Sequence, residues 1–232
     1  SFKRVALFMV NCSASLLFYS MIVLSLFTFL LIRQNPFKYF VIFLEPILVA
    51  FASASATVAI PNLIEGCEKK CKMSTKISKF AIPFFITLHS DGSALFITSA
   101  CIFLASCESK ALVFSDYLTI ILLASLLCLC LPSVPSASLV SMTLILSSLD
   151  ISANGIYLLY TVEWLLDRIR TTVNCYSCAL CSVINYKLII RNKIVYKTSM
   201  SVTMTTAVNE TNNEPANEAR NNQIDQIAVI AN

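Results

Sequence analysis

Long uninterrupted apolar segments constrain this chain more than any other feature. Residues 5–32 carry no charged side chain. A helix needs about 20 apolar residues to span the hydrocarbon core of a bilayer, and this segment is longer than that. It also far exceeds the apolar core of a signal peptide, which has about 7 to 15 residues. We therefore expect residues 5–32 to form a transmembrane helix.

Four further apolar regions follow, at residues 37–64, 80–107, 112–149 and 156–186. Of the 232 residues, 57% are hydrophobic and 13% are charged, and the mean hydropathy is +0.76. Soluble domains of ordinary composition carry about 25% charged residues, so a water-soluble fold is disfavoured. We expect an all-α polytopic membrane protein.

The end of the chain differs in composition from the rest. Residues 198–232 are polar, Asn-rich and free of long apolar runs, as is typical of disordered segments. We expect a membrane domain over residues 1–197 and a disordered cytoplasmic tail over residues 198–232. Because the first residue is Ser1 rather than Met, we also expect a fragment or a processed form.

Basic residues flank the second apolar region on both sides. Arg33 and Lys38 lie at its start, and several lysines between residues 69 and 79 follow it. Cytoplasmic loops are enriched in Lys and Arg, so both ends are expected on the cytoplasmic side. A segment with both ends on one side does not simply span the membrane. We predict a re-entrant helical hairpin with its tip in residues 51–61, where Ser, Ala and Thr predominate.

The fourth region has the opposite kind of flanks. Residues 108–116 and Asp150 are poor in Lys and Arg, so both ends are expected outside. Pro132 and Pro135 lie near its middle, and proline stops one helix and begins another. We predict a second, opposed re-entrant hairpin with its bend at residues 131–136.

The third region is long enough to span the membrane but carries TLHSDGS, residues 87–93, at its middle. Exposed carbonyls and a lone carboxylate are tolerated at that depth only where they line a cavity or hold an ion. We predict a broken helix with an unwound turn at Asp91 and Gly92.

The last apolar region carries a polar stripe. Helical intervals of three and four residues place six side chains on one face: Glu163, Asp167, Arg170, Thr171, Asn174 and Cys178. A charge at the bilayer centre costs about 2.5 to 3.5 kcal/mol on insertion scales. The Arg170 guanidinium therefore needs a partner.

Two interpretations of this partner remain open. Asp167 and Arg170 could neutralise each other as a structural pair. Alternatively, a zwitterionic ligand could bind the stripe, with its ammonium group on an acid, one carboxylate on the arginine and a second on an amide. The second interpretation explains more of the stripe and indicates an acidic amino acid.

Five stretches occur in order along the chain: RQNP (33–36), SASAT (53–57), KISKFAIP leading into HSDGSAL (76–95), VPSASLVSMTLIL (134–146) and EWLLDRIRTTVN (163–174). In these stretches the chain resembles the dicarboxylate/amino acid:cation (sodium) symporters, whose animal members include the excitatory amino acid transporters. The last stretch is the most specific, because DRxRTTxN on a late hydrophobic helix is not expected by chance.

The resemblance implies a transport half in which two opposed re-entrant hairpins flank a broken helix and a final amphipathic helix. It implies sodium-coupled symport of glutamate or aspartate by alternating access, in the plasma membrane. The family's scaffold helices, which hold its members together as trimers, are expected to lie outside this chain, so a homotrimer is expected of the full-length protein.

Carried over by motif, the resemblance assigns roles to individual residues. Asp167 would hold the ammonium group of the substrate, Arg170 its side-chain carboxylate and Asn174 its main-chain carboxylate. Thr171 and Ser93 would supply supporting contacts. Ser55 and Thr57 would stand at the tip of the first hairpin, where the family has a run of serines.

The same comparison implies sodium as a coupled ligand and no other cofactor. The family's NMDGT is HSDGS here, so Asp91 is kept while His89 and Ser90 replace the asparagine and methionine. With Asn174, these are the candidate sodium residues. Other departures are Cys178 and Glu163 at aspartate positions, and Cys130, Ser133 and Ser138 at glycine positions of the second hairpin tip.

Other patterns carry weaker signals. The spacing of Cys175, Cys178 and Cys181 also suits small residues on an interhelical face, so we do not predict a metal centre. His89 could equally be a hydrogen-bonded core group. The lysines of residues 69–79 indicate topology or lipid headgroups rather than nucleic acid. Because no nucleophile with a base and no phosphate loop is recognisable, an enzyme is not expected.

Three functions follow as hypotheses. The first is sodium-coupled symport of acidic amino acids. The alternative is a transport-incompetent relative that regulates or assembles with full-length transporters, which the altered sodium and hairpin residues favour. Neutral amino acid exchange is disfavoured, because Arg170 would then lack a ligand carboxylate.

Overall fold

A computed structural model of the chain describes residues 2–108, 110–129, 137–152 and 155–191. Within these ranges the regular structure is helical, and no strand is assigned. The all-α fold class is confirmed. The chain divides into two compact units, residues 1–186 and 187–232, and of the second only the helical residues 187–191 are described. The tail expected over residues 198–232 lies outside the described residues.

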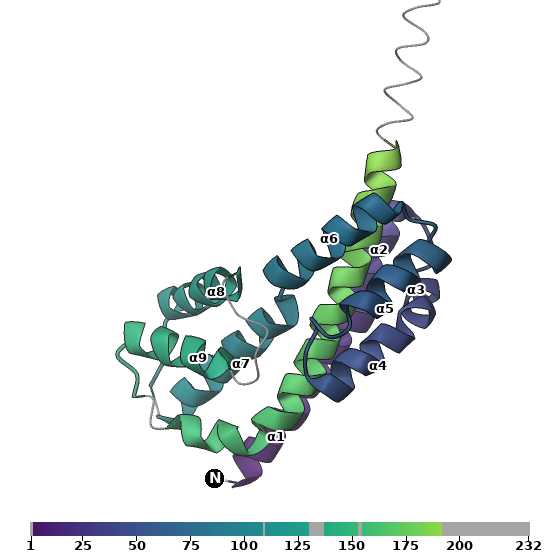
Figure 1. The fold of residues 1–232 in the computed structure, drawn as a ribbon. Helices are drawn as coiled ribbons and strands as arrows, with labels where there is room; N and C mark the ends of the chain where they lie inside the picture. The colour runs from purple at the N-terminus through teal and green to yellow at the C-terminus, as the bar shows by residue number, and fades with distance from the viewer. Residues whose placement is uncertain (1, 109, 130–136, 153–154, 192–232) are drawn as a thin grey trace, which may run out of the picture. The chain divides into compact units, whose positions relative to one another are not determined.

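The first span consists of three consecutive helical segments (Figure 1). The α-helix α1 covers Phe2–Phe18, the π-helix η1 covers Tyr19–Val23, and the α-helix α2 covers Leu24–Ile32. Together they form an apolar helix, Lys3–Ile32, long enough to cross a bilayer. It ends at Arg33, whose φ of 54° lies in the left-handed region.

The second apolar region forms a helical hairpin, as expected. Its descending arm consists of α3, Pro36–Ile42, and α4, Leu44–Ser53, which are bent by 57° relative to each other. Its return arm consists of α5, Ile60–Glu65, and the π-helix η2, Gly66–Lys70. The two arms run side by side, since Asn62 Nδ2 donates to Glu45 Oε1 at 3.2 Å and Lys70 Nζ donates to the Ile42 carbonyl at 3.4 Å. The turn between the arms falls inside the predicted tip.

The third region is a broken helix, but the break is displaced from the predicted position. Helix α6 covers Thr75–Leu88 and helix α7 covers Asp91–Cys107. The non-helical residues are His89, with φ −114° and ψ 97°, and Ser90, with φ −129° and ψ 50°. The predicted unwinding at Asp91 and Gly92 is wrong, because both residues already belong to the first turn of α7. Close packing, described below, explains the glycine instead.

The arms of the second hairpin are α8, Phe114–Leu129, and α9, Ala137–Ser148. At about 1.5 Å per residue, both are shorter than the roughly 30 Å hydrocarbon core, so neither arm spans it alone. Their outer ends lie close together, because Lys110 Nζ bonds the Leu149 carbonyl. The predicted bend at residues 131–136 lies outside the described residues.

The C-terminal helix, Ile156–Arg191, is the most buried of the three long apolar helices: 61% of its apolar window is buried, against 22% for Lys3–Ile32 and 39% for Thr75–Cys107. Leu166 and Val173 pack with α1, α7, α8 and α9. Beyond Asn174, the helix packs with α2, the first hairpin and α6, and Figure 1 shows it in green beside α4 and α5. Its polar stripe therefore lies where two hydrophobic clusters meet.

The exposed surface of these helices is strongly apolar, with side chains such as Val10, Leu30, Val41, Phe80 and Leu126 more than half exposed. Within the described ranges, three helices have the length and composition to cross a bilayer, or four if the bent pair of the first hairpin is counted as one span. Exposed apolar surface on this scale requires a lipid or protein partner. The chain is a multi-pass membrane protein.

Candidate functional site

The polar stripe of the C-terminal helix faces the interior of the helix bundle. Glu163, Asp167, Arg170 and Thr171 are all less than 9% exposed, and Asn174 is partly buried. The helical intervals predicted this shared face. Burying three charged side chains at membrane depth is expensive, so their partners determine what the site can do.

Arg170 lies between two carboxylates. Its Nη2 donates to Asp167 Oδ1, one helical turn away, and lies 3.8 Å from Glu163 Oε1. The guanidinium also stacks over the Phe96 ring of α7, with Cζ 5.0 Å from the ring centroid. The structural pair considered in the sequence analysis is therefore present. It uses only part of the arginine, because Nη1 is buried without a hydrogen-bond partner among the described residues.

The broken helix docks directly on the polar stripe. The backbone N–H of Gly92 donates to Asn174 Oδ1 at 2.8 Å, and Asn174 Nδ2 donates to Ser93 Oγ at 2.9 Å. A Cβ at position 92 would lie 2.9 Å from Asn174 Oδ1 and 3.1 Å from the Arg170 carbonyl oxygen. Glycine is thus needed for close approach of two backbones, at a negative φ. The first turn of α7 and the Arg170–Asn174 turn form one unit.

Asp91 is the centre of a second polar cluster. Its Oδ2 accepts hydrogen bonds from Tyr19 OH at 2.7 Å and Ser177 Oγ at 2.6 Å. His89 Nε2 lies 3.5 Å from the same oxygen and 2.9 Å from Ser177 Oγ. The other carboxylate oxygen, Oδ1, is buried and has no hydrogen-bond partner among the described residues. A carboxylate oxygen with unused lone pairs is a suitable ligand for a hard cation.

The structure brings three of the four candidate sodium residues together. Asp91 and His89 are in contact, and Asn174 touches the adjacent Gly92. Ser90 lies between His89 and Asp91 in the helix break, and its side chain is partly exposed. Imidazole nitrogen favours transition metals, whereas hard cations favour oxygen ligands. Asp91 is therefore a better sodium ligand than His89, and His89 is a neighbour of the Asp91 carboxylate.

Ser55 and Thr57 lie at the tip of the first hairpin, as the resemblance implied. The backbone N–H of Ser55 bonds Ser53 Oγ at 3.3 Å, and the Ser55 side chain is partly buried. The Thr57 side chain is exposed. Hydrogen bonds to the polar stripe come from α7, which contacts Asn174, and from Ser138 of α9, which contacts Glu163.

Three further residues of the site are not identified in the sequence, namely Tyr19, Phe96 and Ser177, and Ser138 is noted there only as a departure at a glycine position of the second hairpin tip. Ser138 Oγ donates to Glu163 Oε1 at 2.9 Å. Ser177 continues the stripe three residues beyond Asn174, so the same interval rule would have found it. Tyr19 lies in the π-helix η1, a feature frequent at functional sites, but nothing in its sequence surroundings indicates that it bonds Asp91.

The three cysteines of the C-terminal helix contact three different groups. Cys175 Sγ bonds the Pro46 carbonyl at 3.8 Å and Cys178 Sγ bonds the Ile82 carbonyl at 3.7 Å. Cys181 Sγ lies 3.6 Å from His89 Nε2. Cys175 and Cys178 thus sit at contacts with the first hairpin and with α6, where a small side chain allows close packing.

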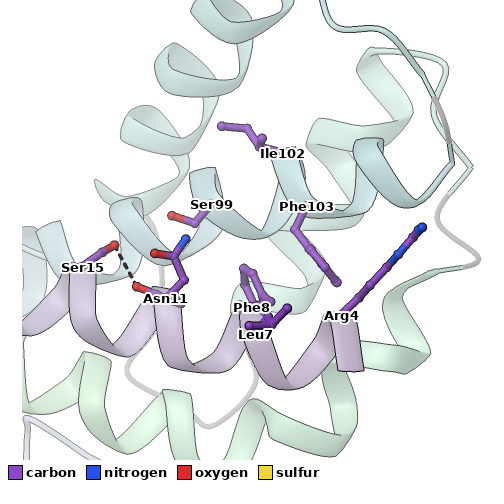
Figure 2. Close-up of a pocket in the computed structure, with 9 residues that line it drawn as sticks. Arg4, Leu7, Phe8, Asn11, Ser15, Ser99, Ile102 and Phe103 are labelled. Atoms are coloured by element: carbon purple, nitrogen blue, oxygen red, sulfur yellow. Dashed lines mark hydrogen bonds between the residues drawn. The ribbon is translucent and has the colours of Figure 1, made fainter. Parts of the chain in front are cut away.

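A groove of about 670 Å³ lies elsewhere, between α1 and α7 (Figure 2). Figure 2 shows Phe8 and Phe103 near its centre, Arg4 at one end, and Asn11, Ser15 and Ser99 at the other. The Phe8 and Phe103 rings stack with centroids 4.6 Å apart. The groove contains no residue of the polar stripe, so it is separate from the candidate site.

The model of the sodium:dicarboxylate symporter family matches residues 1–188. This match covers both hairpins, the broken helix and nearly all of the C-terminal helix. It therefore includes every residue of the candidate site.

Individual relatives carry the same signal. Excitatory amino acid transporter 3 of Oryctolagus cuniculus is 31% identical over 173 residues, which are 75% of this chain and 33% of the relative. The putative sodium-dependent excitatory amino acid transporter glt-6 of Caenorhabditis elegans is 34% identical over 169 residues, 73% of this chain and 31% of the relative. For human excitatory amino acid transporter 2 the identity is 33% over 172 residues, 74% of this chain and 30% of the relative.

The chain thus spans about a third of the length of these relatives. Its helical hairpins, the broken helix docked on the C-terminal helix and the family match agree with one another. This chain belongs to the sodium:dicarboxylate symporter family.

Proposed function

We propose that this chain is the carboxy-terminal transport part of a sodium-coupled symporter of acidic amino acids, which works by alternating access in the plasma membrane. The named relatives are excitatory amino acid transporters, and one is described as sodium-dependent. The chain spans about a third of the length of these relatives, and transport by the whole protein is part of this proposal. A homotrimer is proposed for that full-length form.

One observation carries the proposal. The Arg170 guanidinium is buried among helices of a membrane protein, and its Nη1 has no hydrogen-bond partner among the described residues. A buried cationic N–H group without an acceptor destabilises the fold more than one that is hydrogen-bonded. If the ion pair were purely structural, an acceptor for Nη1 would stabilise the protein further. A ligand carboxylate would satisfy this nitrogen through a charge-assisted hydrogen bond.

The other roles follow from the neighbours of Arg170. Asp167, one turn away, would bind the ammonium group of the substrate. On binding, the Asp167–Arg170 ion pair would be replaced by two contacts, one from each residue to an oppositely charged group of the substrate. Asn174, held by Gly92 and Ser93, would bind the main-chain carboxylate. Thr171 would support it, and Ser55 and Thr57 would close the site from the first hairpin.

Sodium is proposed as a coupled substrate near Asp91. The Asp91 Oδ1 atom, without a partner among the described residues, would be its principal ligand. Asn174 and the break at Ser90 would contribute oxygen ligands. His89 lies beside this carboxylate and would set how readily a cation competes for it.

Calorimetry on the intact protein produced from its longest natural transcript would test the proposal. L-Aspartate or L-glutamate is expected to release or absorb heat on binding only when sodium is present. Uptake of labelled aspartate into proteoliposomes should then depend on an inward sodium gradient. Absence of binding heat from a correctly folded preparation, in any sodium concentration, would exclude the function.

The alternative is a transport-incompetent relative that assembles with or regulates full-length transporters. Two observations favour it: Arg170 is already engaged by Asp167, and His89 lies next to Asp91 where the family has asparagine. Normal surface expression without uptake, together with altered transport by a co-expressed full-length relative, would support this alternative. We propose neither enzymatic activity nor nucleic-acid binding.

A further inference from the structure

Glu163 is a third charged residue of the polar stripe, and its position differs from that of Asp167. Its side chain is buried, with the residue 2% exposed. Its Oε1 accepts a hydrogen bond from Ser138 Oγ of α9 at 2.9 Å and lies 3.8 Å from Arg170 Nη2. Its Oε2 is buried without a partner among the described residues. One carboxylate oxygen thus connects the second hairpin to the arginine.

Glu163 Oε1 makes two different kinds of contact, one with Ser138 and one with Arg170. At 2.9 Å the contact with Ser138 is a hydrogen bond, whereas 3.8 Å to Arg170 is too long for one. Charge-assisted N–H···O bonds are about 2.7 to 2.9 Å long, so the Glu163 carboxylate is about 1 Å short of Arg170. The Glu163 carboxylate is thus hydrogen-bonded to α9, and it lies within ion-pair distance of the guanidinium without a hydrogen bond to it.

The distance between Glu163 and Arg170 is important because the cluster around Arg170 contains more negative than positive groups. The cluster of Glu163, Asp167 and Arg170 contains two carboxylates and one cation. A ligand that brings another carboxylate to Arg170 therefore competes with a carboxylate that the protein already contains. In a buried site such competition is weakly screened.

We propose that Glu163 is an internal competitor for the ligand carboxylate, and that Ser138 holds it back. While α9 lies against the C-terminal helix, Ser138 keeps Glu163 away from Arg170 and the ligand carboxylate can bind. When α9 moves away from the C-terminal helix, Glu163 loses Ser138, closes on Arg170 and displaces the ligand. The position of α9 and the affinity for an acidic side chain are thereby coupled.

This inference rests on the proposed function. Two single substitutions should change the Kd for L-aspartate in opposite directions. Glu163→Gln removes the competing charge but keeps an acceptor for Ser138. The Kd for L-aspartate should fall about fivefold, while that for L-asparagine, which lacks the second carboxylate, should change little. Ser138→Ala releases Glu163 toward Arg170, so the Kd for L-aspartate should rise about fivefold.

The double variant separates this model from simple loss of packing. Glu163→Gln with Ser138→Ala should bind L-aspartate like Glu163→Gln alone, because Ser138 acts only through the Glu163 charge. Ser141→Ala is the matched control, since Ser141 is buried on the same helix one turn later. Weaker binding in both single variants, or additive effects in the double variant, would overturn the proposal.

A measurement without ligand tests the same contact. Amide hydrogen exchange in α9 should be faster in Ser138→Ala than in the wild type, and unchanged in Glu163→Gln and Ser141→Ala. Unchanged exchange in Ser138→Ala would overturn the inference even if the wild type bound no amino acid. A wild type that binds no aspartate but shows the expected exchange pattern would instead count against the proposed function.

Discussion

The amide oxygen of Asn174 accepts a hydrogen bond from the backbone N–H of Gly92 at 2.8 Å. This contact joins residues 82 positions apart in the chain and fixes the first turn of α7 against the Arg170–Asn174 turn. The amide group of Asn174 is thereby oriented, since its Nδ2 must point to Ser93 Oγ. An amide with a fixed orientation can distinguish donors from acceptors in a ligand.

Gly92→Ala should separate these two helices. The new Cβ would lie 2.9 Å from Asn174 Oδ1 and 3.1 Å from a backbone oxygen, and overpacking of this kind costs about 1 to 3 kcal/mol. We expect an unfolding free energy lower by that amount and weaker aspartate binding. Gly66→Ala is the control: its Cβ would meet only the Phe43 ring edge at 3.3 Å. Equal effects of both substitutions would argue against a special role for Gly92.

Arg170→Cys should change substrate preference. The variant loses the donor for a ligand side-chain carboxylate, and a tenfold loss of affinity corresponds to about 1.4 kcal/mol. We expect binding of L-aspartate to weaken at least about tenfold, while neutral amino acids bind as well as or better than in the wild type. Arg168→Cys, on the same helix but partly exposed, should leave the preference unchanged. Acidic selectivity retained in Arg170→Cys would contradict the assignment.

Asp91→Asn should weaken the sodium dependence of binding. The substitution replaces the partly buried carboxylate with an amide of similar size, so a cation loses its charged ligand. The sodium concentration for half-maximal aspartate binding is expected to rise about fivefold or more. Asp150→Asn is a suitable control, because Asp150 is exposed and its φ of 52° suits asparagine. An unaltered sodium requirement in Asp91→Asn would place the ion elsewhere.

The opposed hairpins can be tested by the side from which their ends react. In a background free of reactive native cysteines, Lys38→Cys and Lys76→Cys should both react with a membrane-impermeant maleimide from the cytoplasmic side. Ala111→Cys and Ser152→Cys should react from the other side. All four positions are exposed. If Lys38→Cys and Lys76→Cys were labelled from opposite sides, the first hairpin would be a transmembrane span instead.

Much of the fold could be predicted because its determinants are local. The first hairpin followed from lysines and arginines on both of its flanks, since loop charge sets topology. The shared face of Asp167, Arg170 and Asn174 followed from the 3.6-residue period of the helix. These signals need no knowledge of what the segments pack against.

The conformation and contacts of individual residues could be predicted less well than the helices. The sequence predicts unwinding at Asp91 and Gly92, whereas His89 and Ser90 adopt the non-helical conformation. A glycine in the sequence signals either backbone freedom or close approach, and only the neighbouring helix distinguishes them. The sequence likewise does not give the contacts of Arg170 with Asp167, Glu163 and Phe96, on which its two interpretations depend.

The sequence by itself determined that this chain is a multi-pass helical membrane protein with one polar helix face, because hydropathy, flanking charge and helical period are properties of consecutive residues. Only the tertiary structure decided that Tyr19 and Ser177 bind Asp91 and that Ser138 holds Glu163. Such contacts depend on the rotation and crossing of helices distant in sequence, and these are set by side-chain packing between the helices.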